Sequence, residues 1–187
     1  MIKKEIRIIG IDDSPFNKFK DKEVLVVGVV MRGGLFVDGV LSTRVDVDGS
    51  NATGKIAKMI NKCKFKPQLQ CIFLNGIAVA GFNVVDVRQL SKETRIPVVV
   101  VIRTNPDIAK IKDTLAKIRQ KNKIKLIEKA GKVIQIDNVF VQLTGIDLEK
   151  SKEILRIVCT RSLIPEPLRL AHIIAAGITT GESKGRA

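Results

Sequence analysis

Two adjacent carboxylates, Asp12 and Asp13, directly follow Glu5–Ile11, a segment typical of a buried strand. Acids at the end of a buried strand are costly unless they bind a cation, meet a base or reach water. Mg²⁺ in proteins is commonly held by one or two carboxylates, with water and substrate phosphate as its other ligands. The segment therefore predicts either a metal site that acts on phosphate or a capped turn leading into Ser14-Pro15.

His172 is the only histidine in the chain and so its one candidate for an imidazole acid or base. It follows Arg169 by three positions, which places both side chains on one face of a helix predicted over Pro165–Ala176. Two interpretations stay open at this point. His172 either transfers protons beside a phosphate-binding arginine or packs as an ordinary helix residue.

The segment Gly49–Lys55 has the G-x-x-x-x-G-K spacing of a phosphate-binding P-loop, between a predicted strand and a predicted helix. However, Ile56 stands where that motif needs a hydroxyl for Mg²⁺. P-loop proteins also have a metal-binding acid at the end of a later strand, whereas Ile72-Phe73-Leu74 ends in Asn75. A nucleotide-phosphate site here is a third alternative, and a glycine-rich entry into a helix is the simpler interpretation.

The chain is strongly basic, with 33 Lys and Arg against 19 Asp and Glu, a net charge of +14. Half of this excess lies in residues 110–132, where nine bases face two acids. Such a patch attracts polyanions, although a solvated helix face would look the same. The seven Phe, with no Trp or Tyr, offer few platforms for base stacking. The phosphate contacts predicted from this patch are Lys117, Lys121 and Lys125.

Length and composition favour one globular domain over residues 1–187, with 45% hydrophobic and 28% charged residues. Cys63, Cys71 and Cys159 lie too far apart for a zinc ligand pair, which favours reduced thiols and a cytoplasmic protein. Polar residues and glycines interrupt the longest uncharged span, Pro67–Val85, so we expect no membrane helix.

The periodicity predicts an antiparallel meander followed by alternating helices and strands. The expected strands are Lys4–Ile11, Glu23–Met31, Leu35–Val47, Gln70–Leu74, Pro97–Ile102, Lys125–Glu128 and Lys132–Leu143, the last two with a hairpin near Gly131 or Asp137-Asn138. The expected helices are Asn51–Cys63, capped by Ser50 or Asn51; Val84–Glu93; a helix opened by Asn105-Pro106-Asp107 with core residues Ile108, Ile111, Leu115 and Ile118; Asp147–Val158; and Pro165–Ala176.

This order is that of an α/β, ribonuclease H-like mixed sheet, in which the first strand lies beside the fourth. The ends of Ile8–Ile11 and Ile72–Leu74 are then neighbours. Asp12 and Asn75 are therefore expected at one edge of the sheet.

The segment Pro165–His172, with the sequence Pro-Glu-Pro-Leu-Arg-Leu-Ala-His, resembles the closing motif of endonuclease V. Gly10-Ile11-Asp12 resembles that family's first-strand motif, and Leu74–Ala78 is similar to its second motif. Pro97 with Arg103 resembles a proline-to-lysine spacing of the family. Over nearly its full length the chain resembles an archaeal family of endonuclease V-like proteins, through residues 10–16, 80–86 and 165–169.

The resemblance implies a ribonuclease H-like fold and Mg²⁺-dependent cleavage of DNA or RNA near deaminated purines, with Mn²⁺ as a substitute ion. It makes Asp12 a metal ligand and places Arg103 near the phosphate. Asn75 departs from the pattern, because endonuclease V has a catalytic aspartate there. The wedge tyrosine of that family is absent, and the third acid is not identified; the candidates are Asp13, Asp46, Asp48 and Asp86.

Two hypotheses follow. In the first, a nuclease uses Asp12, Asn75, Arg103 and His172 as its catalytic residues, with Asp12, Asp13 and Asp48 as metal ligands and Arg169 on the phosphate. In the second, the metal chemistry has weakened or been lost, and a basic module binds nucleic acid through its phosphates. The missing aspartate and wedge favour the second hypothesis.

Overall fold

The first three strands form the predicted antiparallel meander. They are β1 (Arg7–Asp13), β2 (Glu23–Arg32) and β3 (Phe36–Asp46) in a computed structural model that describes residues 2–185. Asp12 pairs with Val27 across β1 and β2, and β3 forms one edge of the sheet. The apolar runs predicted these strands to within a few residues at each end.

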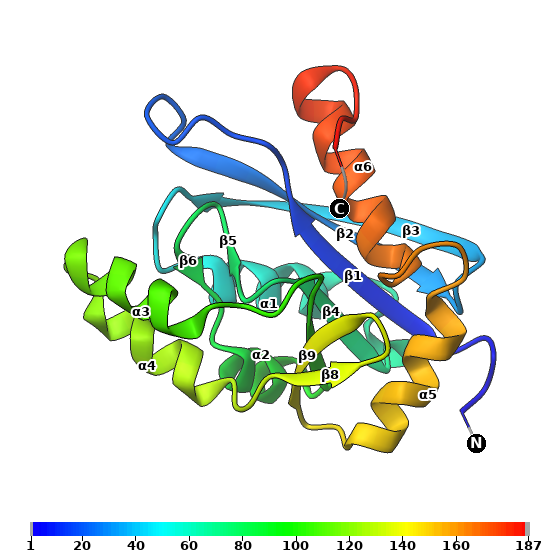
Figure 1. The fold of residues 1–187 in the computed structure, drawn as a ribbon. Helices are drawn as coiled ribbons and strands as arrows, with labels where there is room; N and C mark the ends of the chain where they lie inside the picture. The colour runs from blue at the N-terminus through cyan, green and yellow to red at the C-terminus, as the bar shows by residue number, and fades with distance from the viewer. Residues whose placement is uncertain (1, 186–187) are drawn as a thin grey trace.

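Helices and strands alternate in the rest of the chain (Figure 1). The main sheet has the order β3-β2-β1-β4-β7-β9-β8, in which β1, β4 and β7 are parallel and β9 is antiparallel to β7. The remaining elements are α1 (Ala52–Lys62), the 3₁₀ helix η1 (Lys66–Gln68), β4 (Cys71–Asn75), β5 (Ala78–Val79), β6 (Asn83–Val84), α2 (Val87–Thr94), β7 (Val98–Ile102), α3 (Ile108–Lys117), α4 (Lys121–Lys129), β8 (Ile134–Ile136), β9 (Val139–Thr144), α5 (Leu148–Val158) and α6 (Glu166–Thr180).

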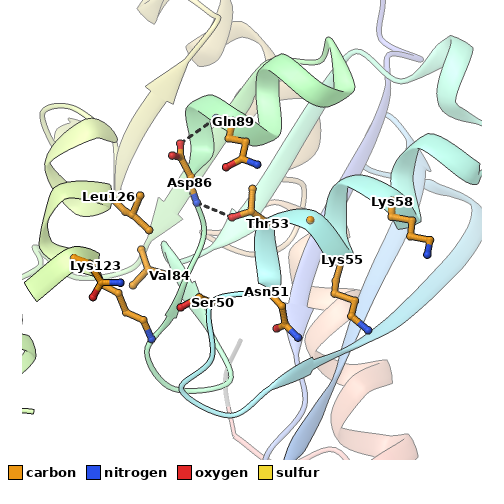
Figure 2. A pocket seen from close by; sticks show the side chains of 12 residues that line it. Ser50, Asn51, Thr53, Lys55, Lys58, Val84, Asp86, Gln89, Lys123 and Leu126 are labelled. Carbon is orange, nitrogen blue, oxygen red and sulfur yellow. Dashed lines mark hydrogen bonds between the residues drawn. The ribbon is translucent and has the colours of Figure 1, made fainter. Parts of the chain in front are cut away.

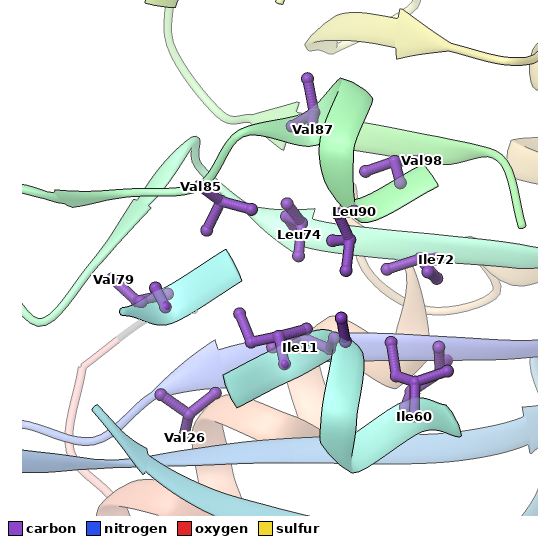
Figure 3. Packing of buried hydrophobic residues seen from close by; sticks show 14 of the residues in the cluster. Ile11, Val26, Ile60, Ile72, Leu74, Val79, Val85, Val87, Leu90 and Val98 are labelled. Atoms are coloured by element: carbon purple, nitrogen blue, oxygen red, sulfur yellow. The ribbon is translucent and has the colours of Figure 1, made fainter. Parts of the chain in front are cut away.

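Alternate residues of the central strands enter two separate cores, one on each face of the sheet. Ile11 and Leu74 pack with Ile60 of α1 and Leu90 of α2 on one face (Figure 3). Ile8 and Phe73 pack with residues of α5 and α6 on the other face. Burial on both faces explains why β1, β4 and β7 are continuous apolar runs that end abruptly in polar residues.

Gly10 allows α6 to approach β1 closely. A Cβ atom at this position would lie 2.5 Å from the backbone nitrogen of Leu168 and would also meet the backbone of Pro167. Any larger residue would therefore push the first turn of α6 away from the strand. This contact sets the position of the helix face that carries Arg169 and His172.

The predicted strand Lys125–Glu128 is wrong, because these residues lie in α4. Lys123 and Ile127 are its buried residues, four positions apart, and the helix packs against α3. The predicted hairpin at Asp137-Asn138 is confirmed as the turn between β8 and β9.

Three helix starts differ from their predicted positions. The helix predicted from Val84 begins at Val87, because Asp86 caps it, and Val84 belongs to β6. Asp107 caps α3, so Pro106 precedes the helix. Asn51 stands at the start of α1 without capping it; the Oδ1 of Asn83 instead accepts from the Ala52 N–H at 3.0 Å.

In residues 2–185, every helix is too short or too polar to cross a membrane. The three cysteines of this part of the chain are free thiols.

Candidate active site

The ends of β1 and β4 place Asp12 beside Asn75, as the strand order predicts. Ile11 is paired with Leu74 in the parallel register. Asp12 is only 3% exposed. The Nδ2 of Asn75 donates to its Oδ2 at 3.0 Å, and the Asp13 backbone N–H donates to its Oδ1 at 3.0 Å. The buried carboxylate thus has a partner on each oxygen.

His172 reaches the same carboxylate from α6. Its Nδ1 lies 3.0 Å from Oδ2 of Asp12, and the ring is half-buried. The other ring nitrogen, Nε2, is buried and has no hydrogen-bond partner among residues 2–185. One nitrogen is therefore fixed by Asp12, while the second is left for a group that enters the site.

A hollow of about 670 Å³ adjoins His172. Its lining includes three arginines, and no acid is among the residues around it; they are Arg103, Thr160, Arg161, Ser162, Leu163, Arg169, His172, Ile173 and Gly185. Guanidinium groups bind phosphate oxygens through paired N–H donors. The composition of this hollow therefore suits a phosphodiester.

Arg103 and Arg169 differ in whether a neighbouring side chain holds the guanidinium group. The Nε of Arg103 is buried and lacks a partner within the described residues. Arg169 is fixed by the buried carboxylate of Glu166, whose Oε2 accepts from Nε at 2.8 Å and from a terminal nitrogen at 2.7 Å. Arg103 thus has an N–H donor that a ligand could use, whereas the guanidinium group of Arg169 is already oriented by Glu166.

Burial raises the pKa of Asp12, although the Asn75 hydrogen bond and the charge of His172 oppose this shift. Burial also raises the pKa of Asp13, to about 6, with the neighbouring charge of Asp12 acting in the same direction. The N–H of Ala80 donates to Asp13 Oδ2 at 2.8 Å and opposes the shift. Asp12 and Asp13 are thus held in surroundings that disfavour the ionised forms of their carboxyl groups.

The other predicted metal ligands lie apart from Asp12. Asp48 has a positive φ of 52° in the turn after β3, and its Oδ1 accepts from the Phe82 N–H at 2.7 Å. Asp86 accepts from backbone N–H groups at the start of α2. Within residues 2–185, His, Cys, Asp and Glu do not form a group of three that could hold a metal. The structure therefore brings together Asp12, Asn75 and His172, and leaves Asp48 outside this group.

Figure 2 shows a separate pocket of about 520 Å³ between the start of α1, the start of α2 and α4. Lys55 and Lys58 line it, but the first N–H of α1 is already bound by Asn83. Lys123 is buried there and donates to the Asp48 carbonyl at 2.6 Å, and burial lowers its pKa. The Gly49–Lys55 segment thus forms a helix entry, and the buried Lys123 of α4 holds the turn at Asp48 that precedes it.

Lys117, Lys121 and Lys125 are exposed on α3 and α4, and none of them lines the arginine hollow. Two residues of the candidate site were not predicted, Arg161 and Glu166. Glu166 had a usable signal, since it precedes Arg169 by three positions and an acid so placed can hold the base. Arg161 lies in an irregular segment, where periodicity gives no information.

The sequence matches the model of the endonuclease dU family over residues 4–179. The chain belongs to this family. A UPF0215 protein of Methanothermobacter thermautotrophicus is 48% identical, and the alignment covers 100% of this chain and 94% of that protein. The predicted relation to an archaeal endonuclease V-like family is confirmed.

Solved structures share the fold of this chain. The crystal structure of a protein of unknown function from Archaeoglobus fulgidus matches with a TM-score of 0.87 at 37% identity, covering 94% of this chain and 99% of that one. Ciona intestinalis endonuclease V, crystallised with DNA containing an inosine, matches with a TM-score of 0.56 at 18% identity, covering 88% and 82%. The latter shows a shared fold, which confirms the ribonuclease H-like prediction.

Proposed function

We propose that this protein is an endonuclease that binds a nucleic-acid strand in the arginine-lined hollow and cleaves it beside Asp12 with one divalent cation. One observation carries the proposal. Asp12, Asn75 and His172 converge at the end of two parallel strands, next to a hollow that contains three arginines and no acid. Carboxylate, imidazole and guanidinium groups are the side chains that phosphodiester hydrolysis uses.

The site fits one Mg²⁺ or Mn²⁺ ion better than two. Asp12 supplies one carboxylate, and the amide of Asn75, once turned, supplies a neutral oxygen; substrate phosphate and water can complete such a set. Two ions about 4 Å apart would need more negative ligands than the described residues offer. A bound ion would offset the charge of the phosphate, and Asp13 adds negative charge nearby.

His172 is suited to moving the proton. Asp12 fixes Nδ1, which leaves Nε2 to accept a proton from water or give one to the departing oxygen. Arg103 and Arg169 hold the phosphate oxygens, and Glu166 keeps Arg169 in place. In this assignment, Asn75 replaces a charged ligand and weakens the ion site without removing it.

The substrate class we propose is a strand that contains a deaminated base. The name of the family, endonuclease dU, points to deoxyuridine, the deaminated form of deoxycytidine. The Ciona endonuclease V structure contains inosine, the deaminated form of adenosine. Deoxyuridine is therefore the first substrate to test and deoxyinosine the second.

The test is cleavage of end-labelled oligonucleotides that carry one deoxyuridine, one deoxyinosine or neither, with Mg²⁺, Mn²⁺ or EDTA. We expect a discrete product near the modified base that requires the metal. Asp12→Asn should abolish it, while Asp113→Asn, a change in an exposed acid on α3, should not. Equal product from wild type and Asp12→Asn would indicate a contaminating nuclease and contradict the proposal.

A second function, binding without cleavage, is favoured by one observation. The Oδ2 of Asp12 already has two protein partners and Oδ1 has one, so an ion has one lone pair of Oδ1 unless it displaces a hydrogen bond. A pure binder would keep its affinity in EDTA. On duplex DNA its log affinity would fall with log salt at a slope of about −0.9 per phosphate contact. Neutralising Lys117, Lys121 and Lys125 would then reduce that slope, whether or not cleavage occurs.

A further inference from the structure

The loop that joins β1 to β2, residues 14–22, projects beyond the sheet (Figure 1). Its tip is held by local hydrogen bonds. The Asn17 N–H donates to Asp21 Oδ2 at 2.7 Å, and the Phe19 N–H donates to Asn17 Oδ1 at 3.0 Å. The N–H groups of Lys20 and Asp21 both donate to the Asn17 carbonyl. The tip therefore presents its side chains in a defined arrangement.

Phe19 stands at this tip with 87% of its surface exposed, more than any other large hydrophobic side chain of residues 2–185. Phe16, three residues earlier, packs against the core, so the loop has an inward aromatic and an outward one. Single exposed apolar side chains are common on protein surfaces, but a phenyl ring held at a loop tip offers a flat face on which another ring can stack.

The surroundings of Phe19 are basic. Lys18 and Lys20 flank it, Lys22 follows, and the Lys18 Nζ lies 4.8 Å from the ring centroid. An aromatic ring among lysines combines a stacking surface for a base with charges for the adjacent phosphates. A protein partner would also be attracted to an exposed ring, but three lysines in five residues favour a polyanion.

We infer that Phe19 stacks on an unpaired base of the nucleic-acid strand bound at Asp12. This inference rests on the proposed function. Phe19 follows Asp12 by seven positions, so the two are at most about 25 Å apart. At 3.4 Å per base step, the stacked base lies within about seven nucleotides of the cleavage site. The contact adds affinity for single-stranded or locally opened segments.

The chain has no Trp and no Tyr, so Phe19→Trp introduces its only indole. The fluorescence of this variant is titrated with oligothymidylate and, separately, with heparin, which is a polyanion without bases. Stacking predicts quenching by oligothymidylate and little change with heparin. Leu35→Trp is the matched control, because Leu35 is 84% exposed in the turn between β2 and β3, at the other end of these strands.

Affinity provides a second measurement. Phe19→Ala should weaken oligothymidylate binding at least about fivefold, while Phe19→Trp should retain it. Because the ring is exposed, neither change should alter the circular dichroism spectrum. Normal binding without quenching, or equal quenching by heparin, would overturn the stacking inference and leave the proposed function intact. If the wild-type protein binds no oligonucleotide at low salt, the proposed function itself fails.

Discussion

Asp13→Asn should stabilise the protein at neutral pH, because the native fold holds this carboxylate where ionisation is unfavourable. Burial and the adjacent Asp12 raise its pKa from 3.8 to about 6. Asparagine keeps the shape of the side chain and an oxygen that can accept from Ala80. The main difference between the two proteins is therefore one negative charge.

The sign follows from proton binding in the two states. Between pH 3.8 and about 6, the folded protein keeps a proton on Asp13 that the unfolded chain has released, so its stability falls as pH rises through this window. The loss is about 1 kcal/mol at pH 4.5 and reaches about 3 kcal/mol above pH 6.5. Asp13→Asn escapes this loss, so its advantage over wild type should grow by about 2 kcal/mol between pH 4.5 and 7.5.

The assay is urea unfolding at pH 4.5 and pH 7.5, followed by circular dichroism. Asp113→Asn, a change in an exposed acid on α3, is the control and should stay within about 0.5 kcal/mol of wild type at both pH values. Mn²⁺ at pH 7.5 should stabilise wild type more than Asp13→Asn, because a nearby cation offsets the charge. An advantage that does not grow with pH, or a loss of stability at pH 7.5, would show that the fold does not disfavour ionised Asp13.

Three further changes test the framework that positions the site. Gly10→Ala should lower the melting temperature by several degrees and reduce cleavage, because its methyl group collides with the Leu168 backbone; a change of less than one degree would contradict this packing. Asp147→Ala should lower the midpoint of urea unfolding through loss of the α5 cap, and an unchanged midpoint would show that the cap is not needed. Asn83→Ala should lower the free energy of unfolding by about 3 kcal/mol, measured by calorimetry, because the fully buried Asn83 side chain accepts from the Ala52 N–H at the start of α1. A loss below about 1 kcal/mol would contradict this role.

Much of the fold could be predicted from the sequence because hydrophobic periodicity reports burial directly. The runs that form β2 and β7 are buried over most of their length, and their short length and many valines favour strands over buried helices. Lys125–Glu128 was predicted wrongly because a short apolar stretch among lysines fits a strand as well as a helix. The deciding contact, α4 against α3, is a tertiary one.

The candidate site was predictable where a residue stands at a strand end or on a helix face. Asp12 and Asn75 follow from the order of the strands, and His172 from its spacing to Arg169. Asp48 was predicted as a metal ligand because it follows the end of the third strand, but its turn has a positive φ and directs the carboxylate to the Phe82 N–H. Such local hydrogen bonding leaves no periodic signal in a sequence.

Binding of a cation at Asp12 is tested most directly by the anomalous scattering of Mn²⁺ in crystals grown with the ion and a non-cleavable deoxyuridine strand. We expect one Mn²⁺ bonded to an Asp12 oxygen, with a phosphate of the strand held by Arg103 or Arg169. A bound strand without Mn²⁺, and with Asp12 still hydrogen-bonded to both Asn75 and His172, would contradict it.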